Sequence, residues 1–260
     1  MTRTFPLAVC AEMLWPEKPF DWRLKRLTER GFEVGIWGWQ SHDLAMLEKS
    51  GARFSSMTGY LTGRLADDAG ADELLASAKR SIAVGKRLNV ARLNLHGTGL
   101  GDRGLPVDPC ENVTGAMWLK AADTLRRIAD LAAEHHVTFM IENLNAAVDH
   151  PGVPFARIAD TLALASSLNR PELRLNLDLY HVQIGEGNVI EWCRACLPWI
   201  GEVQVADVPG RKEPGTGEIN YANVARALKS MGYRGPVCLE AFASGDADAA
   251  LDAFEAAFAV

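Results

Sequence analysis

The sequence predicts a single-domain α/β protein with the architecture of a (β/α)₈ TIM barrel. Short runs rich in Val, Ile and Leu alternate with longer segments of helical periodicity, and this alternation repeats eight times along 260 residues. Such units form parallel strands joined by right-handed crossovers, and eight of them match a closed barrel. No Pro/Gly/Ser-rich linker divides the chain, so we expect residues 1–260 to form one domain.

Eight apolar runs are the predicted strands. Branched apolar residues are typical of strands, and the runs are separated by segments long enough to hold a helix. In chain order, the strands are expected at Leu7–Ala11, Glu33–Ile36, Phe54–Met57, Val90–Leu95, Thr138–Ile141, Arg174–Leu177, Glu202–Val205 and Val237–Leu239.

The segments between these runs are the predicted helices. Gly31 and Gly51 follow the first two, where a residue in the left-handed conformation ends a helix. We expect Asp21 and Ser41 to cap the starts of these two helices, and Pro154 to be the first residue of the fifth. In chain order, the helices are expected at Asp21–Arg30, His42–Lys49, Ala71–Leu88, Val113–His135, Pro154–Leu168, Asn188–Leu197, Tyr221–Met231 and Asp246–Phe258.

Composition narrows the classes of function. The chain is 48% hydrophobic and 23% charged, with a formal net charge of -6, which argues against a nucleic-acid partner because such proteins usually carry a basic surface. No apolar stretch approaches the roughly 20 residues that cross a bilayer, so no membrane association is expected. Cys193 and Cys196 lack the second pair that a zinc knuckle needs, and reduced thiols in a cytoplasmic protein are the expectation.

Polar side chains end four consecutive predicted strands, where the active site of a TIM barrel lies. These side chains belong to Glu142, Asp178, Gln204 and Glu240. Three carboxylates gathered at one mouth would repel one another, and at least one would stay protonated unless a cation balanced them. Carboxylate and amide oxygens suit Mg²⁺ or Mn²⁺, so the pattern predicts a divalent metal ion. Taken singly, each residue could instead end its strand by hydrogen bonding to loop amides.

Four segments carry a resemblance to a known family, namely Ile141–Asn143, Leu177–His181, Val205–Arg211 and Glu213–Tyr221. Over essentially its whole length the chain resembles the hydroxypyruvate isomerase family, part of the wider superfamily of xylose-isomerase-like barrels. The resemblance implies a divalent metal ion held by Glu142, Asp178, Gln204 and Glu240. It also implies that Glu142 and Glu240 act as proton-transfer groups.

The expected reaction converts hydroxypyruvate, a small hydroxy-keto acid, to tartronate semialdehyde. A proton leaves one carbon and another reaches its neighbour, so two carboxylates on opposite sides of an enediolate can serve as base and acid. A metal ion would stabilise the developing negative charge. His181 is expected to hydrogen-bond a substrate oxygen, and Arg211 to pair with a substrate carboxylate. The order in which Glu142 and Glu240 act stays open.

Several alternatives remain at this stage. An isomerase of a four-carbon oxo-acid (2-oxo-tetronate) stays open, as does a keto-sugar 3-epimerase, although such epimerases usually carry a histidine where this chain has Gln204. An apurinic endonuclease would need further histidines after the seventh strand, and a non-catalytic binding barrel would not need two glutamates. The motif Gly99–Gly104 spells G-x-G-x-x-G, but Pro106 and Pro109 follow it, so we expect an active-site loop and not an NAD site. A homo-oligomer also stays open.

Overall fold

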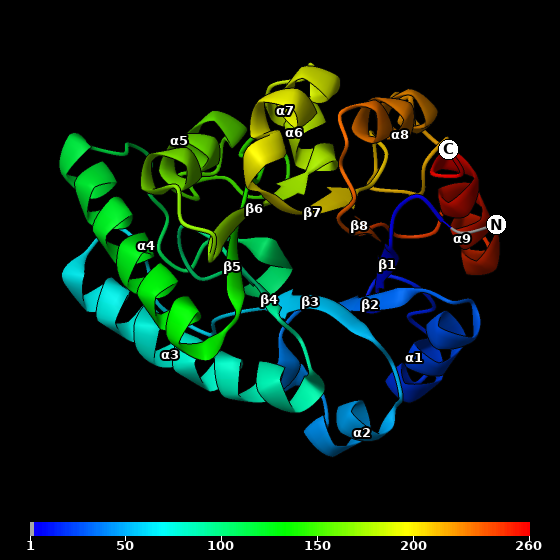
Figure 1. Cartoon of the computed structure of the whole chain (residues 1–260), viewed down its shortest axis with the longest axis horizontal. Coiled ribbons are helices and arrows are strands. Elements are labelled where there is room, and N and C mark those ends of the chain that lie inside the picture. The colour runs from blue at the N-terminus through cyan, green and yellow to red at the C-terminus, as the bar shows by residue number, and fades with distance from the viewer. Residues whose placement is uncertain (1–2) are drawn as a thin grey trace.

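Eight parallel strands pair in chain order in the computed structural model, and β8 pairs with β1 to close a barrel (Figure 1). The structure describes residues 3–260, so the first two residues of the predicted domain lie outside it. The TIM barrel prediction is confirmed. The strands are β1 (Leu7–Cys10), β2 (Glu33–Ile36), β3 (Phe54–Thr58), β4 (Arg92–Leu95), β5 (Thr138–Glu142), β6 (Leu173–Asp178), β7 (Ile200–Val205) and β8 (Val237–Leu239).

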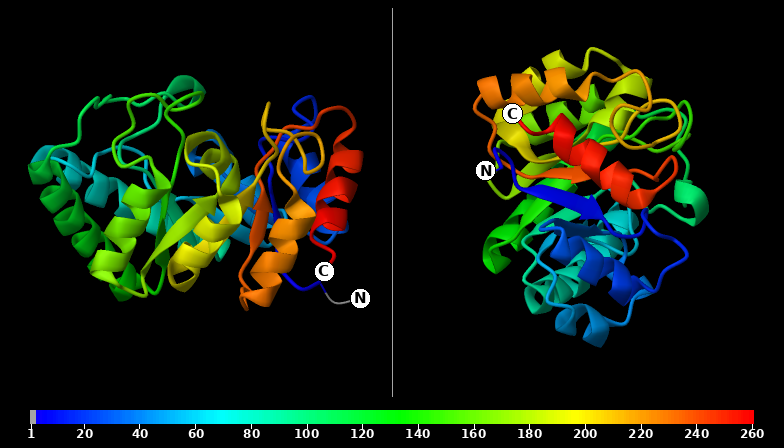
Figure 2. Two further views of the ribbon diagram at one scale, coloured as in Figure 1. Left: turned by 90° about the horizontal axis from the view of Figure 1, so that it is seen from above. Right: turned by 90° about the vertical axis from the view of Figure 1, so that its right-hand side faces the viewer.

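Helices surround the barrel, and the long loops gather at one end of it, with the termini close together near the other end (Figure 2). The helices are α1 (Phe20–Glu29), α2 (Leu44–Lys49), α3 (Asp68–Leu88), α4 (Gly115–His135), α5 (Ile158–Leu168), α6 (Leu179–Gly185), α7 (Val189–Cys196), α8 (Tyr221–Ser230) and α9 (Ala247–Ala257). Three short 3₁₀ segments are η1 (Trp39–Ser41), η2 (Asp102–Gly104) and η3 (Leu197–Trp199). Helix α6 continues directly from β6 and was not predicted.

The two predicted helix caps, Asp21 and Ser41, and the predicted first residue of the fifth helix, Pro154, are wrong. Helix α1 starts after Pro19, and Asp21 lies within its first turn. Helix α2 is capped by Asp43, whose carboxylate accepts the backbone N–H of Ala45, because η1 occupies the residues up to Ser41. Helix α5 begins only at Ile158, since Pro154 packs its backbone carbonyl against Gly97 in a loop.

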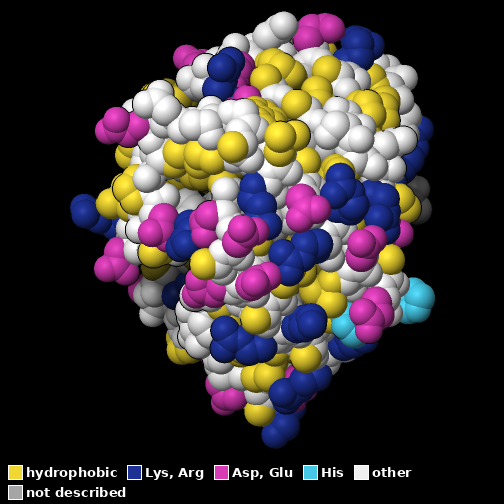
Figure 3. Space-filling view, turned by 90° about the vertical axis from the view of Figure 1, so that its left-hand side faces the viewer, with side chains coloured by type: hydrophobic (Ala, Val, Ile, Leu, Met, Phe, Trp, Pro, Cys, Tyr) yellow, Lys and Arg dark blue, Asp and Glu magenta, His cyan; other side chains and the backbone are white. Residues whose placement is uncertain are grey.

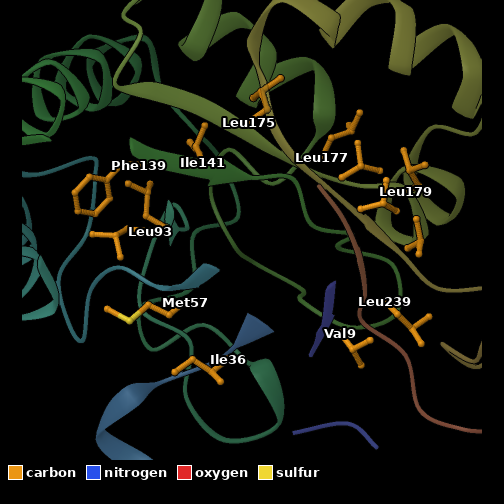
Figure 4. Close-up of a cluster of buried hydrophobic side chains, with 14 of the residues drawn as sticks. Val9, Ile36, Met57, Leu93, Phe139, Ile141, Leu175, Leu177, Leu179 and Leu239 are labelled. Carbon is orange, nitrogen blue, oxygen red and sulfur yellow. The ribbon is translucent and has the colours of Figure 1, made fainter. Parts of the chain in front are cut away.

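The strands have one apolar face and one polar face. Leu93, Phe139 and Leu177 belong to the apolar cluster that joins strands to helices (Figure 4). Successive strand residues point to opposite faces, so the residues between them face the barrel interior. Ser56 on β3 donates a hydrogen bond of 2.7 Å to Glu202 on β7, a contact that has to cross this interior. The interior is therefore polar, whereas branched apolar side chains fill the interior of most TIM barrels.

A buried carboxylate lies deeper in this polar interior, two residues before Gln204 on β7. Glu202 is fully buried, accepts hydrogen bonds from the hydroxyls of Ser55 and Ser56, and lies 3.7 Å from the Arg92 guanidinium. Burial raises the pKa of Glu202, and the nearby Arg92 charge opposes that rise. The interior of the barrel thus contains an ionisable pair, the buried Glu202 and the partly buried Arg92.

Charges of both signs intersperse on the outer face that carries α3 and α4 (Figure 3). Arg127 of α4 pairs with Asp72 of α3 at 2.6 Å, and Lys120 pairs with Asp68 beside it. Such exposed pairs contribute little to stability individually. Within residues 3–260, no helix combines the length and the apolar character that crossing a lipid bilayer requires.

Candidate metal and substrate site

The four residues predicted at the strand ends meet at the C-terminal mouth of the barrel, and all are buried. Glu142 and Asp178 are the last residues of β5 and β6, Gln204 lies one residue before the end of β7, and Glu240 directly follows β8. Glu142, Gln204 and Glu240 line one cavity of about 700 Å³. Asp178 reaches the same place through its contacts with Arg211 and His181.

Three side chains donate hydrogen bonds to one oxygen of Glu142. Its Oε2 accepts from Asn94, from His96 Nε2 at 3.0 Å and from Asn176 at 3.2 Å. His96 is held at its other ring nitrogen, which lies 2.9 Å from the Tyr60 hydroxyl. Burial alone would raise the pKa of Glu142, but the bonds from His96 and Asn94 outweigh burial and hold that pKa below its usual value. The other oxygen, Oε1, stays free of these donors.

Asp178 is held by backbone groups. Its Oδ1 accepts the N–H groups of Tyr180 and His181, which caps helix α6. The Asn143 side chain bonds both the N–H and the carbonyl of Asp178, at 3.0 and 2.9 Å, and thus fixes the end of β6. Burial raises the pKa of Asp178 well above its usual value, and the Arg211 charge opposes this. Oδ2 is left to face the other site residues.

The tautomer of His181 follows from its neighbours. The Asn145 carbonyl oxygen accepts the backbone N–H groups of Val148 and Asp149, so the Asn145 amide nitrogen is the atom that lies 2.7 Å from His181 Nδ1. That nitrogen donates, so Nδ1 carries no proton and Nε2 does. Burial lowers the pKa of His181 well below its usual value, which keeps the ring neutral. Nε2 is buried and makes no hydrogen bond among the described residues, and Asp178 Oδ2 lies 3.5 Å from it.

Arg211 lies among the carboxylates of Glu142, Asp178 and Glu240, which are hereafter called the acid cluster. Its guanidinium donates to Glu240 Oε2 at 2.7 Å, lies 3.5 Å from Asp178 Oδ2, and stacks over the Tyr180 ring. Trp37 donates its indole N–H to the other oxygen of Glu240 at 2.7 Å. Burial raises the pKa of Glu240, and Arg211 opposes this rise. The cation that three converging carboxylates require is thus supplied in part by the chain itself.

Gln204 bridges the two glutamates. With its amide nitrogen turned toward the carboxylates, it lies 3.3 Å from Glu142 Oε1 and 3.3 Å from Glu240 Oε2. In the opposite orientation, its oxygen would face the same position. The amide can therefore donate hydrogen bonds to the two carboxylates through its nitrogen, or coordinate a cation placed between them through its oxygen.

The donor set fits a divalent cation. Glu142, Asp178 and His181 present ligand atoms that all lie within 4.8 Å of one another. Two carboxylates and the Gln204 amide are the oxygen donors that Mg²⁺ and Mn²⁺ take. The amide oxygen of Asn176, next to them, is buried with no donor in the part of the chain that the structure describes. Because the protonated Nε2 of His181 is not a ligand atom, the fit rests on the oxygens.

Three contacts of the site were missed from the sequence. Asn94 and Asn176 alternate with leucines along their strands, and this period of two could have identified them as inward-facing. The bond from Asn145 to His181 joins residues 36 positions apart, and no local pattern signals it. Trp37, which follows β2, also reaches the mouth, where its indole N–H donates to Glu240.

Known proteins resemble this chain in sequence and in fold. A family model described as a xylose isomerase-like TIM barrel matches residues 30–258. The chain is 39% identical to a 2-oxo-tetronate isomerase of Pectobacterium atrosepticum over 113 residues, which are 44% of this chain and 43% of that protein. It is 32% identical to the hydroxypyruvate isomerase of Escherichia coli over 118 residues, 45% of each. These matches span less than half of the length of either relative.

A solved structure shares the fold over almost the whole length. The crystal structure of an AP endonuclease, family 2, from Brucella melitensis superposes with a TM-score of 0.83 and covers 98% of this chain and 99% of that one. The sequence identity is 24%, so this likeness shows the fold alone.

Proposed function

The chain belongs to the xylose isomerase-like TIM barrel family, and on that premise we propose that it is a metal-dependent isomerase that converts hydroxypyruvate to tartronate semialdehyde. One observation carries the proposal. Glu142 and Glu240, both buried, line one cavity from different strands, and the Gln204 amide lies between them. Two carboxylates so placed can exchange protons with adjacent carbons of one small substrate.

The proposed metal ligands are the oxygens of Glu142, Asp178, Gln204 and Glu240. A bound Mg²⁺ or Mn²⁺ would supply Lewis-acid stabilisation of the negative charge that develops on the substrate oxygens. The donors around Oε2 of Glu142 leave Oε1 to face the cluster, so this residue can contribute one oxygen and keep its orientation. Trp37 restrains Glu240 in the same way.

The reaction moves protons between defined atoms. A proton leaves C3 of hydroxypyruvate and one is delivered to C2, while the hydroxyl proton passes from O3 to O2. Glu142 and Glu240 serve the two carbons through an enediolate. His181 donates its Nε2–H to a substrate oxygen, which supports negative charge there without the cost of a buried cation. Arg211, which was expected to pair with a substrate carboxylate, already pairs with Glu240 and Asp178, so we assign it to the substrate oxygens next to Glu240.

Proton NMR of hydroxypyruvate in D₂O tests this proposal. The purified protein supplied with Mg²⁺ or Mn²⁺ should form tartronate semialdehyde and incorporate deuterium at carbon, and chelation should stop both processes. Absence of metal-dependent conversion together with absence of exchange would overturn the proposal.

A four-carbon oxo-acid is the second candidate substrate. The cavity of about 700 Å³ falls within the range that holds drug-sized ligands, so it exceeds the need of a three-carbon acid. The likeness to a 2-oxo-tetronate isomerase supports the same candidate. Comparing kcat/KM for hydroxypyruvate and 2-oxo-tetronate under identical conditions decides between them, because the better substrate has the higher value.

A further inference from the structure

The motif Gly99–Gly104 forms a short hairpin over the cavity. The N–H of Val107 donates to the carbonyl of Gly99 at 2.8 Å, and the N–H of Gly101 donates to the carbonyl of Leu105 at 2.8 Å. Helix α4 starts only at residue 115, so the glycines open no helix that could receive a pyrophosphate. The residues between Gly99 and Val107 are hereafter called the hairpin.

The hairpin rests on a residue next to the acid cluster. His150 Nδ1 donates to the carbonyl of Gly104 at 2.7 Å, and the His150 ring meets the His181 ring edge to face at 5.1 Å. Gly104 has a φ of +74°, and a side chain there would come within 2.7 Å of the His150 ring. This glycine is thus required by a close approach, and the approach fixes the height of the hairpin above His181.

Arg103, next to Gly104, is a cation without a partner. It is exposed, has a φ of +57°, and lines the cavity that Glu142 and Glu240 line. Its guanidinium makes no hydrogen bond or ion pair with any residue in the range 3–260. By contrast, Arg64 nearby pairs with Asp67 and with an acidic residue at position 108.

The two arginines that line the cavity differ in whether their charge is paired. Arg211 is the other arginine or lysine that lines the cavity within the described range, and it pairs with Glu240 and Asp178. A divalent ion and Arg211 together only balance the three carboxylates, which leaves no net positive charge there for an anionic substrate. Arg103 stands after β4, opposite β8 in the barrel, and its charge is uncompensated.

We propose that Arg103 is the specificity residue that pairs with the carboxylate of the substrate, while the carbonyl and hydroxyl groups lie at the acid cluster. The substrate class is therefore oxo-acids, and neutral keto sugars are disfavoured. This inference rests on the proposed function for the position of the reacting carbons. Arg suits the role because its planar fork can bind both oxygens of a carboxylate.

Kinetics of two Arg103 variants test the inference. Arg103→Gln should raise KM for hydroxypyruvate about tenfold with kcat within about threefold of wild type, since a charged hydrogen bond is lost at a partly exposed position. Arg103→Lys should recover part of the loss. Arg126→Gln, which removes the same charge from an exposed site on α4, is the matched control and should leave both constants unchanged.

Binding of tartronate, a dicarboxylate, separates this inference from the proposed function. Calorimetry in the presence of Mg²⁺ should show that Arg103→Gln weakens the binding of tartronate about tenfold. The binding of glycolate should weaken less, because glycolate has no second carboxylate to pair with Arg103. An inactive wild type would overturn the proposed function, yet the binding comparison would still stand. Equal tartronate affinity in wild type and Arg103→Gln, or a fall in kcat at unchanged KM, would overturn the role of Arg103.

Discussion

The carboxylate of Asp207 organises the loop that carries Arg211, and replacing it with asparagine is a sharp test of how the site is built. Asp207 is fully buried just after β7. Its Oδ1 accepts the N–H groups of Val208 and Ile219 at 3.0 and 2.9 Å. Its Oδ2 accepts those of Gly215 and Gly217, both at 2.9 Å. One side chain therefore ties down a loop that spans residues 207–221.

The cost of Asp207→Asn follows from these four contacts. Asparagine keeps one acceptor oxygen, and its amino group faces two backbone N–H groups, so two hydrogen bonds are lost. Each bond to a charged acceptor contributes about 1.5–3 kcal/mol, which gives about 3–6 kcal/mol for the pair. Relaxation of the loop and entry of water reduce this figure, and we expect a loss of about 2–4 kcal/mol in the free energy of unfolding.

Urea denaturation followed by circular dichroism measures this loss. Asp246→Asn is the matched control, because Asp246 caps α9 through one backbone N–H and is exposed, and it should cost about 1 kcal/mol or less. The same Asp207→Asn protein should show a raised KM, since Arg211 loses its support. A loss no larger than that of the control would refute the reasoning.

Three further predictions concern the charges of the site. Asn145→Asp should move the proton of His181 from Nε2 to Nδ1, and ¹⁵N shifts of the ring would reveal the exchange; an unchanged tautomer would contradict the assignment. Burial lowers the pKa of His150 and His181, so only the unfolded chain takes up these protons as pH falls through about 6.5. The free energy of unfolding should therefore fall between pH 7.5 and 5.5 by up to about 1.4 kcal/mol per histidine. In His150→Gln, the part of this fall that His150 contributes should be absent. Mg²⁺ or Mn²⁺ at 100 times Kd should stabilise the protein by about 2.7 kcal/mol, and Asp178→Asn should abolish the effect in a thermal-shift measurement.

The parts of the structure that local pattern determines were predictable. Alternation of apolar runs and helical segments is local, and Glu142, Asp178 and Glu240 were found because each directly ends an apolar run. The start of α5 was missed because a contact between Pro154 and Gly97, which are far apart in sequence, keeps the chain out of the helix.

The long-range hydrogen bonds and ion pairs between the site residues were not predictable in the same way. Trp37 reaches Glu240 across 203 positions, and only barrel closure brings them together. The position of Arg211 within the acid cluster depends equally on the loop that Asp207 folds. Asn94 was within reach of sequence reasoning, since its strand alternates polar residues with leucines, and parallel strands buried on both faces are usually apolar throughout.

The central claim is that Glu142 and Glu240 are both required for proton transfer, and the rate of hydroxypyruvate conversion in Glu→Gln variants tests it most directly. The variants are compared by proton NMR, and the metal content is measured on the same samples. Glu172→Gln is the control, because Glu172 directly precedes β6, at the end of the strand opposite to Asp178. We predict that Glu142→Gln and Glu240→Gln each lose at least about 100-fold in rate, while the control keeps the wild-type rate. A wild-type rate in either site variant would contradict the account.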